Sequence, residues 1–404
     1  MGQGLPNRSV HITDKTKFVF SGAKSFFELA AEKKSPNVVG FTSEKGLLVP
    51  VKKLEPEPRS ETEELDDDFE FTQPEPEARK RKPVSRHIQV FDMKSVDSAR
   101  DRIKRTEVDQ KRRLEPEIVF AAKNDGKREI PKLGKLPNVL RKLEVTFPNF
   151  SEAISAIGEE FAMAAASHPS DFRISPLLLD GVPGIGKTAF AQSLAAGFGL
   201  PFLKINAGNM QHAASIVGTD SHWANAAPGG IFSLLAEGDL ATGVVLLDEV
   251  DKLNTSPKYS ILPALLELLE PETSRTFRDV SIDVVLDASH LIVLMTSNTR
   301  RIVDEALLSR TRIFEVEEPS AEQRISIVKR WAKSIAKQNR SRVKPTIDHE
   351  DIERLAGLPM DLRALNRILR SSFGRALLKQ SRVLEIDWAS LEKQHRSRPI
   401  GFAH

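Results

Sequence analysis

The sequence predicts an α/β protein in which a parallel sheet, flanked by helices, is followed by a small all-α domain. Between about residues 137 and 320, short runs that are apolar throughout alternate with amphipathic stretches. Such runs are typical of parallel strands that helices cover on both faces. From about residue 321 onward, the apolar residues recur at helical spacing. We therefore expect the ordered part of the chain to begin near Pro137.

Individual elements follow from the same patterns. The expected strands are the apolar runs Ile174–Asp180, Pro201–Asn206, Gly243–Asp248 and His290–Ser297, with a further strand ending at Phe314. The expected helices are Thr188–Phe198, Ile261–Leu269, Ala321–Gln338 and Asp361–Lys379.

Composition excludes several classes of protein. The 404 residues include 59 Lys or Arg and 56 Asp or Glu, and a net charge of +3 is too small to indicate nucleic acid or membrane by itself. Cysteine is absent, which excludes disulfides, thiolate metal sites and cysteine nucleophiles. The sequence has no apolar run of about 18 residues and no signal-peptide core near Met1. We expect a soluble, cytoplasmic protein without a membrane partner.

The N-terminal part has a different character. We expect residues 1–53 to be a small or partly ordered segment and residues 54–136 to be a disordered linker. Glu55–Ala78 contains 11 acidic residues, and low hydrophobicity with high like charge does not repay chain entropy. Arg79–Arg113 contains 13 Lys or Arg against five acidic residues. This basic segment is either a nucleic-acid contact or a solvated, partly helical linker.

The strongest chemical signal is the segment from Gly181 to Thr188. It fits the pattern G-x-x-x-x-G-K-[ST] and directly follows an expected strand. Gly181, Gly184 and Gly186 let backbone N–H groups approach and surround a phosphate, while Lys187 can reach the β- and γ-phosphates. The hydroxyl of Thr188 can bind Mg²⁺. We therefore expect a nucleoside triphosphate as the ligand.

A second signal lies 60 residues after Thr188, at Asp248 and Glu249. An apolar strand delivers these adjacent carboxylates at its C-terminal end, where ligands bind in parallel α/β sheets. We expect Asp248 to hold the Mg²⁺, because Mg²⁺ prefers hard oxygen ligands. We expect Glu249 to orient or deprotonate the attacking water.

Three further polar residues are weaker candidates. Asn298 ends the strand around His290–Ser297, where it either holds the attacking water or simply forms a turn. Arg310 and Arg363 are candidates for a guanidinium that stabilises the transferring phosphoryl group. The alternative for either arginine is a solvated surface charge.

Taken together, these motifs resemble an AAA+ ATPase, and most closely the ATPase module of the Lon proteases. The resemblance covers about residues 145–395. It implies an AAA+ nucleotide-binding domain over 137–320, a helical lid over 321–395 and a tail over 396–404. The stretches that carry it are Val245–Lys252, Ala264–Glu272, Thr296–Asn298 and Leu307–Arg310.

The resemblance assigns roles to the phosphate-loop and strand-end residues. Lys187 and Thr188 match the lysine and hydroxyl of the Walker A motif. Asp248 and Glu249 match the Walker B pair. The implied cofactors are ATP and Mg²⁺, with Thr188 and Asp248 as the protein's metal ligands.

It also assigns roles to the more distant polar residues. Asn298 matches the first sensor position, and Arg310 matches the arginine finger, which in the family acts on the ATP of the neighbouring subunit. Arg363 matches the second sensor, in the lid. Arg312 and Arg367 are the nearest competitors for the two arginine roles. The implied assembly is a homo-oligomer, a hexameric ring.

One aromatic residue points to a substrate. The stretch Gly218–Gly229 is similar to the Lon segment that presents an aromatic side chain to the central pore, and Trp223 stands at the aromatic position. A flat, amphipathic ring can grip an extended polypeptide without reading its sequence. The alternative is a tryptophan of the core. Ala224 replaces a larger apolar residue of the family pattern.

The sequence leaves three functions open. The first is an ATP-driven motor that remodels or unfolds protein substrates, alone or with a separate partner protein. The second is an ATPase that acts on DNA through Arg79–Arg113, and the third is a nucleotide-gated scaffold or switch. Only nine residues, Arg396–His404, follow His395, so we expect no peptidase activity from this chain alone.

Overall fold

The computed structural model describes two compact units of the chain, Met1–Lys80 and Arg81–His404. In the first unit, it describes only β1 (Ser43–Glu44) and β2 (Leu47–Leu48), which pair antiparallel. Our expectations for the rest of 1–84 and for the tail over 396–404 lie outside the described residues. In the second unit the described residues are 85–209, 213–220, 223, 226–253, 261–341, 343–389 and 391.

The second unit contains a five-stranded parallel sheet with the strand order β11-β5-β10-β7-β6. The expected strands are confirmed. The three central strands, β5, β10 and β7, are buried along most of their length because their residues are apolar on both faces, whereas the edge strands β6 and β11 are more exposed. The register pairs Asn206 with Asp248 and Ser297 with Asp180, so these polar residues share the carboxyl edge. The strands are β5 (Leu177–Asp180), β6 (Phe202–Asn206), β7 (Val244–Asp248), β10 (Ile292–Ser297) and β11 (Arg312–Glu315).

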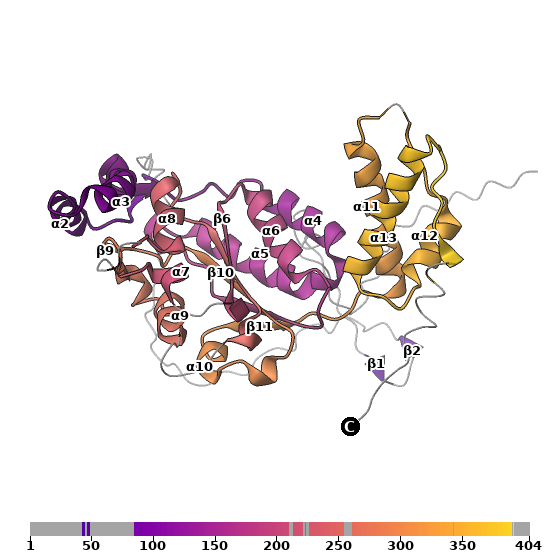
Figure 1. Ribbon diagram of the computed structural model, residues 1–404. Helices are drawn as coiled ribbons and strands as arrows, with labels where there is room; N and C mark the ends of the chain where they lie inside the picture. Colours follow the sequence, from indigo (N-terminus) through magenta and orange to yellow (C-terminus); the bar gives the residue numbers. More distant parts are fainter. Residues whose placement is uncertain are drawn as a thin grey trace, which may run out of the picture. The chain divides into compact units, whose positions relative to one another are not determined.

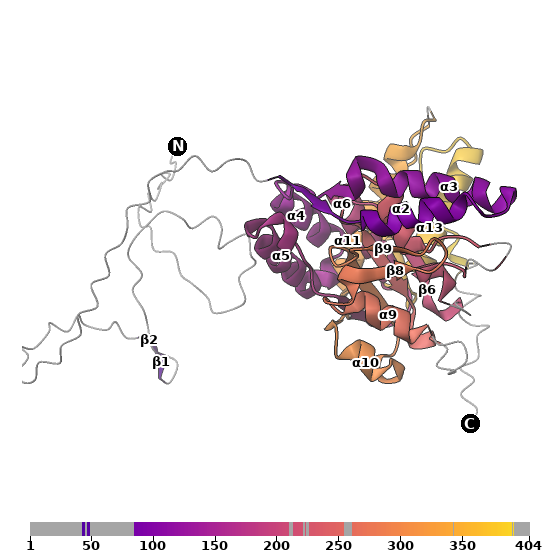
Figure 2. The same ribbon diagram turned by 90° about the vertical axis from the view of Figure 1, so that its left-hand side faces the viewer.

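Helices cover the sheet. In Figures 1 and 2, α4, α5 and α6 lie together above the sheet, and α9 and α10 lie below it. The helices expected over Thr188–Phe198 and Ile261–Leu269 are confirmed as α6 and α9. The helices are α4 (Leu136–Thr146), α5 (Ser151–Ala166), α6 (Lys187–Phe198), α7 (Ala214–Val217), α8 (Gly230–Glu237), α9 (Leu262–Leu269) and α10 (Glu305–Leu308).

Short elements connect these layers. An antiparallel hairpin, β8 (Phe277–Asp279) and β9 (Val284–Leu286), is inserted between α9 and β10. The 3₁₀ segments are η1 (Lys123–Gly126), η2 (Pro148–Phe150), η3 (Pro169–Asp171), η4 (Ala207–Asn209), η5 (Val250–Lys252), η7 (Ser274–Thr276) and η8 (Arg300–Ile302).

The expectation of a disordered linker as far as residue 136 is wrong for residues 85–136. This stretch forms β3 (His87–Gln89), α2 (Met93–Ile103), α3 (Val108–Ala122) and β4 (Lys127–Glu129). High charge density concealed a helical apolar period. Val96, Ala99 and Ile103 are buried on α2, and α3 buries three further apolar residues in the same way. Burial of these side chains provides the hydrophobic stabilisation that a disordered segment lacks.

Arg128 anchors this N-terminal layer. Its side chain is fully buried, and it donates to the carbonyl of Phe120 at 2.7 Å and to that of Leu235 at 2.9 Å. These carbonyls lie in the last turns of α3 and α8, which lack N–H donors from a following turn of the same helix. A buried guanidinium that satisfies both ends therefore joins the layer to the sheet domain.

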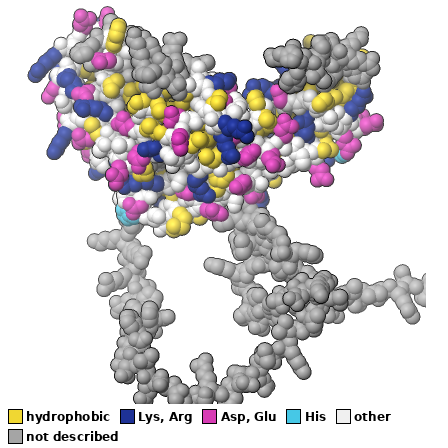
Figure 3. Space-filling model, turned by 90° about the horizontal axis from the view of Figure 1, so that it is seen from below, with side chains coloured by type: hydrophobic (Ala, Val, Ile, Leu, Met, Phe, Trp, Pro, Cys, Tyr) yellow, Lys and Arg dark blue, Asp and Glu magenta, His cyan; other side chains and the backbone are white. Residues whose placement is uncertain are grey.

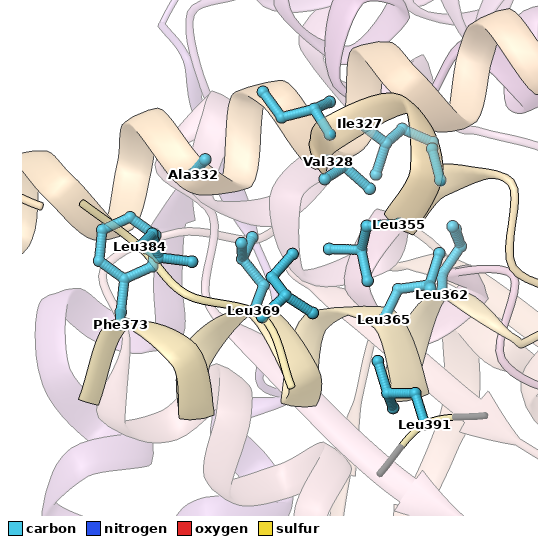
Figure 4. Close-up of a cluster of buried hydrophobic side chains, with 13 residues drawn as sticks. Ile327, Val328, Ala332, Leu355, Leu362, Leu365, Leu369, Phe373, Leu384 and Leu391 are labelled. Carbon is cyan, nitrogen blue, oxygen red and sulfur yellow. The ribbon is translucent and has the colours of Figure 1, made fainter. Parts of the chain in front are cut away.

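A helical lid follows the sheet domain. The helices expected over Ala321–Gln338 and Asp361–Lys379 are confirmed as α11 (Ala321–Gln338) and α13 (Leu362–Leu378), with α12 (His349–Ala356) between them. Figure 4 shows Leu355, Leu365 and Leu369 converging between the helices, and these side chains belong to a buried apolar cluster. The lid thus has a hydrophobic core of its own.

Among the described residues, no helix combines the length and the apolar composition that crossing a membrane needs.

Candidate nucleotide-binding site

The loop between β5 and α6 is a narrow backbone cradle. The backbone φ angles of Gly181, Gly184 and Gly186 are 158°, 87° and 108°. Residues other than glycine rarely adopt φ values in this region. A Cβ on Gly181 would lie 2.3 Å from the carbonyl oxygen of Val316. The glycines are therefore required by the path of the loop, which ends at the N-terminus of α6. A loop and helix N-terminus of this kind provide backbone N–H groups for a phosphate.

Lys187 lies at the centre of the site and is only 7% exposed. Its ammonium donates to the carbonyl of Gly181, to that of Val182 at 3.1 Å and to Oδ1 of Asn298 at 3.1 Å. Burial lowers the pKa of Lys187, although the nearby Asp180 and other carboxylates oppose that shift. The first residue of α6 and the residue after β10, which are 111 positions apart, thus meet at one point.

Asp248 is the second centre. Its carboxylate accepts the hydroxyl of Thr188 at 3.1 Å and that of Thr296 at 2.6 Å, and it forms an ion pair with Lys204 at 2.7 Å. Burial raises the pKa of Asp248, but the hydrogen bonds from Lys204 and Thr296 outweigh it and hold the pKa below the ordinary value. The carboxylate is therefore ionised and fixed in place at neutral pH.

Glu249 follows directly and has a left-handed backbone, with φ 61° and ψ 51°. A residue with a side chain is strained in this region, and such strain is concentrated at functional sites. Its backbone N–H donates to Thr296 at 2.9 Å, and its carboxylate forms an ion pair with Lys252 at 2.9 Å. Thr296 therefore binds both Asp248 and the next residue.

A buried amide lies beside this pair. Asn206 ends β6 directly opposite Asp248, and its Oδ1 is buried without a hydrogen-bond partner. Orphaned buried acceptors are uncommon and mark places where a ligand or a changed rotamer completes the bonding. Asn206 therefore belongs to the same polar edge.

The structure does not bring Arg310 to the loop of its own chain. Its guanidinium is paired with Glu270 at 3.1 Å and donates to the carbonyl of Ala306. It follows α10, which lies on the other side of the sheet from α6 in both ribbon views (Figures 1 and 2). Its competitor Arg312 lies on β11 and is paired with Glu160 at 3.0 Å.

Burial is the main cause that lowers the pKa of Lys187, and neighbouring carboxylates oppose it. The charge of Arg363 is close enough to lower that pKa further. Arg363 stands in the first turn of α13, two residues after Asp361, whose side chain lies against the loop. A Cβ on Gly184 would lie 2.9 Å from the Cβ of Asp361. The lid thus meets the phosphate-binding loop through the first turn of α13. Arg367, its competitor, is exposed one turn further along the same helix.

A cleft of about 350 Å³ lies between the start of α5 and the lid. Pro148, Phe150 and Val316 line it, and Gln323 of α11 donates to the carbonyl of Pro148 across it at 3.1 Å. We expect the adenine pocket to lie between the Pro148–Ile157 region and the lid. The cleft is lined by residues of both parts and is therefore a candidate for this pocket.

Trp223 lies apart from these residues and is 65% exposed. The alternative of a core tryptophan is therefore wrong. Its backbone N–H donates to the carbonyl of Asp220 at 3.1 Å, and its carbonyl accepts from Ala226 at 2.9 Å. The aromatic side chain is presented outward from a turn.

The basic segment is partly neutralised within the chain. Arg100 pairs with Asp97, Arg102 pairs with Asp283, and Lys104 pairs with Asp101. Figure 3 shows basic and acidic side chains interspersed over the described part of the face seen from below. A nucleic-acid footprint concentrates one sign of charge on a face, which these paired residues of α2 do not do.

Several polar members of this site carry no prediction of a role from the sequence. Lys204 and Asn206 lie in a run that is expected only to be an apolar strand, while Thr296 and Lys252 lie in stretches that match the family pattern without an assigned role. One signal was available. Lys204 and Asn206 are two apart within an otherwise apolar run, and period-2 spacing places both side chains on one face of the strand.

One segment of the chain matches a known protein family. Residues 177–318 match the family model AAA, "ATPase family associated with various cellular activities". This segment contains the sheet strands β5 to β11, the glycine loop with Lys187 and the strand ends with Asp248 and Glu249, whereas Arg363 and most residues of the cleft lie outside it. The chain therefore contains an AAA domain.

Relatives of the chain in sequence include Lon proteases. The chain is 34% identical over 151 residues to that of Mycolicibacterium smegmatis, which is 37% of this chain and 19% of the relative. It is 33% identical over 177 residues to that of Leptospira interrogans, covering 43% and 21%. Lon protease 2 of Borreliella burgdorferi is 31% identical over 196 residues, covering 48% and 25%. The AAA module is thus Lon-like, and the chain spans about a fifth to a quarter of these relatives.

Solved structures support the fold. Hsp104 with ATPγS and FITC casein, in its closed state, has a TM-score of 0.51 at 20% identity, over 62% of this chain and 49% of that one. The S. cerevisiae Hsp104–casein complex in the extended conformation has a TM-score of 0.50 at 19% identity, over 66% and 50%. At these identities the likeness describes the fold alone.

Proposed function

We propose that the protein is an ATP-hydrolysing motor that remodels or unfolds polypeptide substrates. The observation that carries this proposal is the meeting of Lys187, Thr188 and Asp248 at the carboxyl edge of the sheet. A buried ammonium at a glycine cradle and a hydroxyl bound to a fixed carboxylate are the groups that phosphoryl transfer requires.

The cradle and its neighbours fit Mg²⁺-ATP. The backbone N–H groups of Gly184 and Gly186 and the ammonium of Lys187 would hold the phosphates. The hydroxyl of Thr188 and the carboxylate of Asp248 are hard oxygen donors 3.1 Å apart, which suits Mg²⁺ together with phosphate oxygens and water. When bound, the ion neutralises charge that develops on the phosphates.

Water activation falls to Glu249 and Asn298. The carboxylate of Glu249 can accept a proton from an attacking water, and the left-handed backbone of this residue ends the strand at this position. The carboxylate of Glu249 forms an ion pair with Lys252. This ion pair has to open before Glu249 serves as a base. Asn298, which accepts a hydrogen bond from Lys187, would orient the same water.

The proposed assembly is a hexameric ring in which Arg310 acts on the nucleotide of the next subunit. The contacts of Arg310 support this role, because its guanidinium pairs with Glu270 and donates to the carbonyl of Ala306 rather than to the loop of its own chain. Arg363 is the proposed sensor of the same subunit, since it acts on the pKa of Lys187.

The proposed substrate is polypeptide because Trp223 is exposed on a turn. A ring that presents such a side chain can contact an extended chain without sequence preference. The paired charges of α2 make the DNA alternative less favourable, and nothing specific supports the scaffold.

ATP turnover tests the substrate class. We would measure it for the wild type and for Trp223→Ala, with an unfolded polypeptide, with duplex DNA or with neither. We expect stimulation by the polypeptide that Trp223→Ala loses. Stimulation by DNA alone, or by neither, would contradict the polypeptide motor. The exposed Val383→Ala is a matched control because it removes an exposed apolar side chain elsewhere.

A further inference from the structure

The segment Gly218–Gly229, which carries Trp223 and which we call the Trp223 segment, is held at both ends by the β8–β9 hairpin. At the first end, the N–H of Val280 donates to the carbonyl of Val217 at 2.8 Å. At the second end, the N–H of Gly229 donates to Oδ2 of Asp279 at 2.6 Å. Asp279 and Val280 are adjacent in sequence, so one short stretch of the hairpin holds both ends of the segment.

The two ends of the Trp223 segment also approach each other closely. The N–H of Thr219 donates to the carbonyl of Ala227 at 2.9 Å. A Cβ on Gly229 would lie 2.1 Å from the carbonyl oxygen of Ile216, and Gly218 has φ 87°. The two ends of the Trp223 segment therefore leave no room for side chains at Gly218 and Gly229. Their position depends on the hydrogen bonds that hold them.

Asp279 is unusual among the carboxylates because its side chain is completely buried. Oδ1 accepts the N–H groups of Ser281 and Ile282, both at 3.0 Å, while Oδ2 is left for Gly229. One oxygen thus closes the turn of the hairpin, and the other binds the Trp223 segment. Burial raises the pKa of Asp279 to about 6, although these three amides oppose the shift, so the carboxylate is ionised at pH 7.

The hairpin itself is fixed from its opposite side by the N-terminal layer. The N–H of Asp92 donates to the carbonyl of Val285 at 2.9 Å, and the N–H of Asp287 donates to that of Val90 at 2.7 Å. Arg102 of α2 donates to the carbonyl of Ile282 at 2.7 Å. Because the hairpin is held in this way, it can serve as a rigid support.

We propose that Asp279 is a positioning residue for Trp223, which acts by holding the amide of Gly229 on a hairpin that is itself fixed by the N-terminal layer. The role of Trp223 in substrate contact rests on the proposed function, whereas the anchoring of the segment does not. Asp279 would therefore determine where the aromatic side chain lies during each cycle.

The substitution Asp279→Asn separates the two halves of this arrangement. The amide oxygen can keep the bonds from Ser281 and Ile282, but the NH₂ group then faces the N–H of Gly229 and cannot accept from it. Asp283→Asn is the matched control, because Asp283 belongs to the same turn but pairs with Arg102 and Arg278 on the exposed side.

Hydrogen–deuterium exchange of the full chain tests the anchor directly. In Asp279→Asn, we expect the amide of Gly229 to exchange about 10-fold faster or more, since a bond to a charged acceptor is lost. We expect Asp283→Asn to leave that rate unchanged. Equal protection of Gly229 in the wild type and in Asp279→Asn would overturn the proposal.

A second variant covers the case in which Asp279→Asn does not fold. Gly218→Ala places a methyl group 3.0 Å from both carboxylate oxygens of Asp279, and we expect it to accelerate exchange at Gly229. Unchanged exchange in that folded variant would equally overturn the anchor.

A kinetic measurement separates positioning from a merely structural role. Asp279→Asn should raise the polypeptide concentration that half-saturates stimulation more than it lowers the maximal rate. If the wild type shows no polypeptide stimulation, the proposed function fails while the exchange result still decides the anchor. If exchange accelerates but half-saturation does not move, Asp279 holds the segment without positioning Trp223.

Discussion

Thr188 donates its hydroxyl to the carboxylate of Asp248 at 3.1 Å, although the two residues are 60 positions apart in the chain. The first stands in the opening turn of α6 and the second at the end of β7. Their contact joins the phosphate-binding loop to the acidic strand before any ligand is considered. A site held together in this way needs little reorganisation on binding, and preorganised electrostatics are the largest contribution in many enzymes.

Removal of the buried ammonium should abolish tight nucleotide binding. Lys187→Ala leaves the phosphates without their main cation, and hydrogen bonds to charged groups contribute about 1.5–3 kcal/mol each. We expect affinity for a fluorescent ATP analogue to fall about 10-fold to 100-fold, as measured by titration. Lys333→Ala, an exposed lysine of α11, is the control. Unchanged affinity in Lys187→Ala would show that nucleotide does not bind at this loop.

The action of Arg310 between subunits has a mixing test. Arg310→Ala and Glu249→Gln should each be slow alone, the first by about 10³-fold or more. In mixed rings, some interfaces combine an intact Glu249 of one subunit with an intact Arg310 of its neighbour. We expect phosphate release by the mixture to exceed that of either variant. A mixture that assembles but stays as slow as its components would show that Arg310 does not act across the interface.

The lid core should carry much of the lid's stability. Leu369 is fully buried in α13, and Leu369→Ala should lower the free energy of unfolding by about 2–5 kcal/mol, because a cavity remains. Leu378 is 87% exposed on the same helix, and Leu378→Ala should change it by less than about 0.5 kcal/mol. Denaturant unfolding gives both values, and equal effects would contradict the packing of α13.

The buried Asp279 predicts a pH dependence of stability. Burial raises its folded-state pKa to about 6 from 3.8, so its contribution is present below pH 3.8 and is lost as pH rises through 6. At about 1.4 kcal/mol per unit, the loss is about 3 kcal/mol. The stability of the wild type relative to Asp279→Asn should therefore fall by about that amount between pH 4 and 7. Parallel pH profiles of unfolding would contradict the raised pKa.

The sheet and the centre of the site were predictable from local sequence. The run that ends at Asp248 is apolar throughout, and parallel strands end at one edge, so Lys187 and Asp248 had to meet. The glycine pattern before Lys187 identified the loop because the backbone there admits no other residue.

Contacts between distant residues were not predictable in this way. Lys204 reaches Asp248 only because β6 pairs with β7, and strand order is not encoded in either strand. Asp279 looks like an ordinary turn residue until Gly229, 50 positions earlier, is placed against it. The helices α2 and α3 were hidden because overall charge, rather than apolar spacing, dominated the interpretation of that stretch.

The central claim is that Glu249 activates water for ATP hydrolysis at this site. The most direct measurement is phosphate release from ATP by the wild type and by Glu249→Gln, at equal occupancy by nucleotide. The account predicts that the variant binds ATP as the wild type does and releases phosphate about 10²-fold to 10⁴-fold more slowly. Equal rates at equal occupancy would contradict it.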